Sequence, residues 1–111
     1  MKTHVKALIV GGGAVGVSIA YHLAKFGWED VVLLERDELT SGSTWHVAGL
    51  LPLFNMSFAT SHIHDYSVKF YKDLEVETGL NPGFSIVGNL RMAQSQARMD
   101  EYMLYASTAE T

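Results

Sequence analysis

The sequence contains no cysteine among its 111 residues. Disulfide bonds and metal sites with thiolate ligands are therefore excluded from this chain, and a reducing compartment is compatible with its composition. Basic residues are also few: eight Lys and Arg stand against twelve Asp and Glu, for a formal charge of −4. Because phosphate binding needs clustered Lys and Arg, and no such cluster occurs here, the composition disfavours a nucleic-acid-binding surface.

Long apolar runs are missing as well. No stretch approaches the ~20 apolar residues that a membrane-spanning helix needs. Only Met1–His4 precede the first apolar run, which leaves no room for a signal or transit peptide. The expectation is a cytoplasmic protein without a membrane partner, and its 48% apolar content is sufficient for one small packed domain.

The first third of the chain has the pattern of a βαβ unit. Val5–Val10 is apolar, rich in β-branched residues and closed by glycines, as in a buried parallel strand. Ala14–Phe26 changes to helical spacing, and Gly27 stands where a helix would end. The large apolar residues of this helix recur on one face, which we expect to point inward: Val15, Ile19, Leu23 and Phe26. Val31–Leu34 is the second strand, so we predict an α/β, Rossmann-like FAD/NAD(P)-binding unit.

The remainder continues into helices and what we predict to be the first strands of a substrate domain. A helix is expected from about Ser61 to Thr78, with an apolar stripe of Ile63, Tyr66, Phe70 and Leu74 and a stop at Gly79. A turn at 81–83 is followed by expected strands Phe84–Val87 and Leu90–Ala93, kinked at Gly88. A third helix should begin near Ser95, with an inward face of Met99, Tyr102, Met103 and Ala106.

Two strands are too few for a complete doubly wound sheet. We therefore expect an incomplete domain, the N-terminal fragment of a longer protein. Residues 1–80 would form the N-terminal part of the FAD-binding domain, and residues 81–111 would start the substrate or cap region.

Three glycines carry a nucleotide-binding fingerprint. Gly11, Gly13 and Gly16 are spaced as G-x-G-x-x-G, directly after a predicted strand and at the start of a predicted helix. Gly11 would permit the tight turn, Gly13 would let a pyrophosphate approach the helix N-terminus, and Gly16 would let the helix pack closely. Ala14 and Val15, within the motif, belong to the same candidate site. A glycine-rich turn without a ligand is the alternative.

Glu35 ends the second strand, 19 residues after Gly16. An acid at about this spacing accepts hydrogen bonds from the ribose hydroxyls of a dinucleotide, and its charge disfavours the 2′-phosphate of NADP. Arg36 is expected near the adenine, although a surface position fits it equally well. The fingerprint and the acid do not by themselves separate FAD from NAD.

The next segment distinguishes the two cofactors by resemblance. The stretch S-T-W-H-V-A-G-L at 43–50 resembles the dimethylglycine and sarcosine dehydrogenase family, within the D-amino-acid oxidase superfamily of flavoproteins. The similarity continues through G-L-N-P-G-F-S-I-V-G-N-L-R-M-A at 79–93 and so covers nearly the whole chain.

The resemblance implies FAD as the cofactor, joined covalently to His46 through the methyl group on its benzenoid ring. Gly42, Ser43 and Thr44 would lie along the dinucleotide, and Gly49 and Leu50 complete the matched motif. A neutral imidazole is a competent nucleophile for such a bond. The residues alone would otherwise indicate a structural, partly buried role for His46.

The function that follows is FAD-dependent oxidation of an N-methylated amine resembling dimethylglycine or sarcosine. The resemblance also implies electron-transfer flavoprotein and folate as partners of regions outside this chain. A non-catalytic regulatory member of the same family and an NAD-dependent dehydrogenase are the alternatives. No metal site is expected, because His62 and His64 would point to different sides of a helix. Catalytic acids and bases, the exact amine, the electron acceptor and the oligomeric state are not indicated by the sequence.

Overall fold

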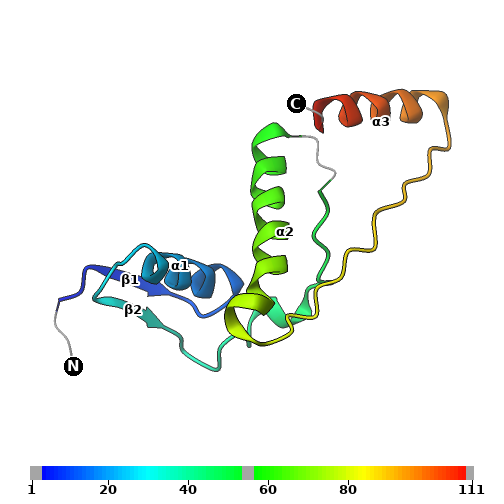
Figure 1. Ribbon diagram of the computed structural model, residues 1–111. Helices are drawn as coiled ribbons and strands as arrows, with labels where there is room; N and C mark the ends of the chain where they lie inside the picture. Colours follow the sequence, from blue (N-terminus) through cyan, green and yellow to red (C-terminus); the bar gives the residue numbers. More distant parts are fainter. Residues whose placement is uncertain (1–3, 54–56, 110–111) are drawn as a thin grey trace. The chain divides into compact units, whose positions relative to one another are not determined.

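The computed structural model describes residues 4–53 and 57–109 (Figure 1). Its elements in chain order are β1 (Ala7–Val10), α1 (Ala14–Lys25), β2 (Val31–Leu34), the 3₁₀ helix η1 (Ser43–His46), α2 (Phe58–Thr78) and α3 (Gln96–Ala109). The chain divides into two units, Met1–Gly49 and Leu50–Thr111. Within the described ranges, every helix is too short or too polar to cross a membrane.

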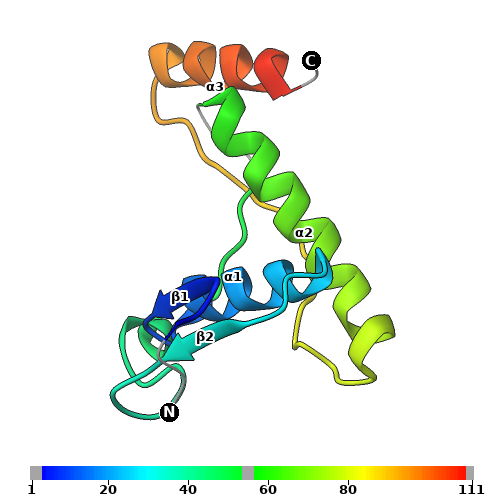
Figure 2. The ribbon, with the colours of Figure 1, turned by 90° about the vertical axis from the view of Figure 1, so that its left-hand side faces the viewer.

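In the first unit, β1 and β2 form a parallel pair, in register from Ala7 beside Val31 to Val10 beside Leu34. α1 connects the two strands and lies across one face of the pair (Figures 1 and 2). The mixed α/β architecture and the β-α-β order are therefore confirmed. The second strand has the predicted limits, whereas β1 begins two residues later and α1 ends one residue earlier than expected.

α1 approaches the sheet through its smallest residue. Gly16 is buried, and a Cβ atom added there would lie 1.9 Å from the carbonyl oxygen of Gly11 and 3.4 Å from a methyl group of Ile9. Ile9, 9% exposed, has the most buried side chain of β1. The expectation that Gly16 permits close helix–strand packing is thus supported by the space around it.

The inward face predicted for α1 was largely wrong. Val15 and Phe26 are 75% and 76% exposed, and Ile19 is 46% exposed. The face toward the strands is instead formed by Gly16, Ala20 and Leu23. These residues are spaced by four and three positions, and Ala20 and Leu23 are half-buried. Counting only large apolar residues missed this face, because close packing here depends on a residue with no side chain.

α1 ends within one residue of the predicted position, just before Gly27. Gly27 has a φ of +75°, in the left-handed region that favours glycine. The N–H of Trp28 donates to the carbonyl of Leu23 and that of Gly27 donates to Ala24, both at 2.9 Å. These bonds satisfy carbonyls at the end of the helix and turn the chain toward β2.

In the second unit, α2 begins three residues earlier than predicted and ends at the predicted Gly79, whose φ is +71°. Its most buried side chain is Val68, at 7% exposure, whereas Ile63 and Tyr66 of the predicted stripe are 64% and 54% exposed. The buried side also carries His64, whose Nδ1 lies 2.5 Å from the carbonyl oxygen of Pro52. The predicted stripe was therefore only partly right: Phe70 and Leu74 are half-buried, but Ile63 and Tyr66 are exposed.

The strands predicted at 84–87 and 90–93 are absent, and this stretch is irregular (Figure 1). Among the described residues the only sheet is the β1–β2 pair, so no strand beside this stretch takes up its backbone groups. The turn before it does form, with Gly83 N–H donating to Asn81 Oδ1 at 2.7 Å. α3 starts next to Ser95 as predicted, and Arg98 N–H donates to the Ser95 hydroxyl at 3.3 Å.

The close approach at Gly16 gives a prediction for stability. Gly16→Ala should lower the free energy of local unfolding by about 1–3 kcal/mol, because the added methyl group meets backbone rather than a movable side chain. Gly42→Ala is the matched control, since nothing lies within 4 Å of its Cβ position. Hydrogen exchange of peptides covering 7–25, measured on the full-length protein by mass spectrometry, reports this difference. Equal exchange in the two variants would contradict the packing described.

Candidate functional site

The turn between β1 and α1 is fixed by backbone geometry. Gly11 has a φ of +106°, which L side chains rarely adopt, and its N–H donates to the carbonyl of Leu34 at 2.8 Å. Gly12 is buried, and Gly13 directly precedes the first residue of α1. The N-terminus of α1 therefore adjoins this glycine turn, a position that favours a bound anion.

The segment that follows β2 folds back over the glycine turn and is hydrogen-bonded to it at three points. The N–H of Gly12 donates to Glu35 Oε2 at 2.5 Å. The N–H of Thr40 donates to the carbonyl of Gly12 at 3.0 Å. The N–H of Ala14 donates to the Thr44 hydroxyl at 2.9 Å. Residues 35–44 and 12–14, far apart in the sequence, thus form one structural unit.

The Glu35 carboxylate is held by backbone donors on both oxygens. Besides the bond from Gly12 to Oε2, the N–H groups of Arg36 and Asp37 donate to Oε1 at 2.8 and 3.2 Å. The donors Gly12, Asp37 and Arg36, in that order, hold the pKa of Glu35 below its ordinary value, and desolvation offsets them only in part. The carboxylate is therefore ionised throughout the neutral range.

A hollow of about 810 Å³ lies over the glycine turn, within the ~300–1,000 Å³ typical of small-molecule sites. Ten of the predicted site residues line it: Gly11, Gly13, Ala14, Val15, Gly16, Glu35, Arg36, Gly42, Ser43 and Thr44. The exposed apolar residues Val15 and Ile19 of α1 form part of its wall. The glycine motif and Glu35 therefore line one and the same hollow.

The other predicted site residues lie elsewhere. His46 and Gly49 belong to the same unit but are not among the lining residues, and Leu50 is the first residue of the second unit. His46 is exposed, with its Nδ1 3.1 Å from the carbonyl oxygen of Gly42. The rings of Trp45 and His46 lie with their centroids 3.9 Å apart. Since a carbonyl only accepts, this contact makes Nδ1 the protonated nitrogen and leaves the lone pair of a neutral imidazole on Nε2.

Some residues of the site were not found from the sequence. Asp37, Ser41 and Val47 also line the hollow, and Gly12 both donates to Glu35 and accepts from Thr40. Gly12 stands in the middle of three consecutive glycines, which was the available signal. A Cβ atom at Gly12 would lie 3.1 Å from Glu35 Oε2 and 2.5 Å from a methyl group of Leu39. Thr40, with a φ of +67°, had no sequence signal for its role.

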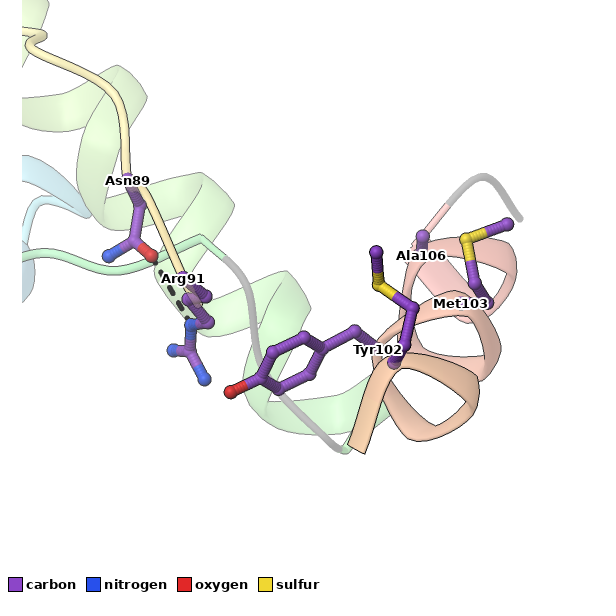
Figure 3. A pocket seen from close by; sticks show the side chains of 6 residues that line it. Asn89, Arg91, Tyr102, Met103 and Ala106 are labelled. Carbon is purple, nitrogen blue, oxygen red and sulfur yellow. Dashed lines mark hydrogen bonds between the residues drawn. The ribbon is translucent and has the colours of Figure 1, made fainter. Parts of the chain in front are cut away.

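A second, smaller hollow of about 320 Å³ lies in the second unit. It is lined by Asn89, Arg91 and the four residues predicted as the inward face of α3: Met99, Tyr102, Met103 and Ala106. Figure 3 shows the Tyr102 ring reaching from α3 toward Arg91, whose Nε donates to Asn89 Oδ1 at 3.2 Å. Met99 and Met103 are 50% and 66% exposed, so this face is only partly covered. No group of three His, Asp or Glu side chains in the described ranges is placed to bind a metal ion.

Comparison with known proteins points to one family. The family model for FAD dependent oxidoreductases (DAO) matches residues 6–111. Human mitochondrial dimethylglycine dehydrogenase is 52% identical over 101 residues, 91% of this chain and 12% of that protein. Human mitochondrial sarcosine dehydrogenase is 43% identical over 96 residues, 86% of this chain and 10% of that protein. The mouse mitochondrial regulatory subunit of pyruvate dehydrogenase phosphatase is 41% identical over 99 residues, 89% of this chain and 11% of that protein.

These matches confirm the resemblance on which the sequence-based expectation rested. The chain spans about 12% of the length of the dimethylglycine dehydrogenase that it matches.

The bonds around Glu35 generate a prediction for cofactor binding. Glu35→Gln keeps the shape of the side chain but replaces one acceptor oxygen by an NH₂ donor. That NH₂ must face either the N–H of Gly12 or the N–H groups of Arg36 and Asp37, so at least one of these hydrogen bonds is lost. FAD affinity of the flavin-free, full-length protein should fall about tenfold, the scale of one hydrogen bond to a charged group. Glu38→Gln, a neutralisation three residues away, is the control. Unchanged affinity in Glu35→Gln, measured by titration, would show that this carboxylate has no part in binding.

The same bonds predict a pH dependence. Because the pKa of Glu35 is lowered in the folded protein, the stabilisation by its charge is fully present above the pKa of the unfolded chain. It is lost only as the pH falls through the lower, folded-state pKa. The local stability of the glycine turn should therefore stay constant from neutral pH down to the ordinary Glu value of about 4.3 and decline below it. Hydrogen exchange across a pH series checks this, and a decline that begins near neutral pH would contradict it.

Proposed function

This chain belongs to the FAD dependent oxidoreductase family, and from that premise we propose that its protein oxidises an N-methylated amine with FAD held over the glycine turn. When bound, FAD supplies the acceptor for a hydride from the N-methyl carbon, and the substrate is left as an iminium. The residues of this chain bind and orient the cofactor. The observation that carries the proposal is the Ala14–Thr44 hydrogen bond, which joins the family-specific 43–50 segment to the general dinucleotide fingerprint.

The residues present fit a dinucleotide. The Gly13 position is tight for a side chain, since a Cβ atom there would lie 3.0 Å from Thr44 Oγ1. The N-terminus of α1 favours a pyrophosphate, and Thr44, which accepts from Ala14, keeps its own proton to donate. Backbone N–H groups occupy three acceptor positions of Glu35, and about four are available on a carboxylate, so one position remains for a ribose hydroxyl. We assign Arg36 to the adenine side and Gly42 and Ser43 to the dinucleotide.

His46 is proposed as the covalent anchor of the flavin. The Gly42 carbonyl holds Nδ1–H, so Nε2 is the nitrogen that would form the bond to the ring methyl carbon. His46 loses its proton and the methyl carbon loses one hydrogen as the C–N bond forms. The net reaction releases two electrons and two protons, which reduce dioxygen to hydrogen peroxide. Gly49 and Leu50 complete the motif and are assigned to the same cofactor.

Dimethylglycine and sarcosine, named in the relatives, are both N-methylated glycines, so a substrate of this class is proposed. We also propose that the βαβ unit is Rossmann-like, that residues 1–80 belong to the FAD-binding domain and that residues 81–111 begin the substrate region. Folate and electron-transfer flavoprotein are the proposed partners of the full-length protein. The names of the human relatives place those proteins in mitochondria, so the predicted cytoplasmic location is not confirmed and stays a prediction.

A non-catalytic protein is the competing proposal, since a regulatory subunit is 41% identical to this chain. The Trp45–His46 pair is the feature on which we distinguish the two, because only an amine-oxidising member needs the flavin anchor. An NAD-dependent dehydrogenase, the other alternative from the sequence, leaves Ser43–Gly49 without a role and does not fit membership of an FAD dependent family.

The covalent bond predicts the outcome of acid denaturation. Precipitated full-length protein should keep its yellow colour, and a peptide containing Thr44–Gly49 should be heavier by the mass of the flavin nucleotide. His46→Ala should still bind FAD, because the glycine turn and Glu35 remain, but should release it all in acid. His22→Ala is the control, a histidine of the same unit that contacts its own helix through Ser18. Complete release of flavin from the wild-type protein would remove the covalent assignment and leave the family membership intact.

A further inference from the structure

The strongest unassigned feature is the contact between Thr44 and the start of α1. The Thr44 hydroxyl accepts from the Ala14 N–H at 2.9 Å across 30 positions in the sequence. Thr44 is the only half-buried residue of η1, since Ser43, Trp45 and His46 are exposed. A single hydroxyl thus connects the N-terminus of α1 to the turn that carries His46.

We propose that Thr44 is a positioning residue that sets the place of His46 relative to the dinucleotide turn; this rests on the proposed covalent anchor. η1 is a single 3₁₀ turn with about 2.0 Å rise per residue, so His46 lies a fixed short step from Thr44. The backbone of the same turn orients the imidazole, through the Gly42 carbonyl and Nδ1. The turn is followed by Gly49 with a φ of +70°, so the chain changes direction soon after His46.

Thr44 therefore links the two parts of the proposed cofactor site. One part is the glycine turn Gly11–Ala14, proposed to bind the pyrophosphate, and the other is η1, which carries His46; Thr44 Oγ1 joins them through the Ala14 N–H. Without this hydroxyl, η1 retains its own backbone but loses its side-chain bond to α1. Covalent attachment depends on alignment of Nε2 with the reacting carbon, and misplacement by about 1 Å can cost on the order of 100-fold in rate.

A simpler role for Thr44 is to bind phosphate only. The two roles differ in a measurable way. A phosphate ligand changes how much FAD is needed to fill the site, whereas a positioning residue changes the rate of attachment once the site is full. The limiting rate at saturating FAD therefore separates them.

The experiment uses flavin-free, full-length protein produced under riboflavin limitation, to which FAD is added over a range of concentrations. Samples are precipitated in acid at intervals, and protein-bound flavin is measured by absorbance and peptide mass. Thr44→Val removes the hydroxyl at nearly constant shape, and Thr44→Ser restores it. Thr78→Val is the matched control: its hydroxyl also accepts a backbone N–H, that of Leu80 at 3.2 Å, but in the other unit. Should Thr44→Val not fold, Thr44→Ala replaces it in the comparison.

The limiting attachment rate should fall about tenfold or more in Thr44→Val and return close to the wild-type rate in Thr44→Ser, with Thr78→Val unaffected. A wild-type limiting rate in Thr44→Val, with only the half-saturating FAD concentration raised, would overturn the positioning role. A slow Thr44→Ser would overturn it as well, because the hydroxyl is then not what matters. Wild-type protein that binds FAD without attaching it would instead overturn the covalent anchor of the proposed function, and the positioning role with it.

Discussion

The candidate site depends on the way in which the segment after β2 is hydrogen-bonded to the glycine turn. Glu35, Thr40 and Thr44 each make one bond to the backbone of Gly12–Ala14. These bonds bring a widely shared dinucleotide motif and a much more specific Trp-His turn into one unit. A parallel pair of strands with α1 across one face supplies the base, and the missing side chain of Gly16 allows α1 to come close enough.

Electrostatics and space within this unit favour the same kind of ligand. The N-terminus of α1 attracts an anion, while the ionised Glu35, which accepts from Gly12 N–H, can also accept hydroxyl hydrogen bonds. Exposed apolar residues of α1 line the same hollow as Glu35. A dinucleotide carries a charged centre flanked by sugar hydroxyls and flat apolar rings, so its chemistry matches each part.

Local patterns allowed much of this to be predicted from the sequence. The limits of β2, the stops at Gly27 and Gly79 and the start of α3 follow from short-range rules about glycine, capping and β-branched residues. The strands expected at 84–87 and 90–93 failed because a strand depends on a neighbour that local pattern does not specify. The face of α1 and the Ala14–Thr44 bond were missed for a related reason: both are set by contacts between distant residues.

The central claim is that this unit holds a flavin dinucleotide. The visible absorption spectrum of the full-length protein as purified tests it most directly, with flavin quantified against protein by absorbance. We expect the absorption bands of oxidised flavin at about one flavin per chain, and their loss in Gly13→Val, where a branched side chain would crowd Thr44 Oγ1 at the start of α1, the proposed position of the pyrophosphate. A colourless wild-type protein that binds NAD but takes up no FAD would contradict it.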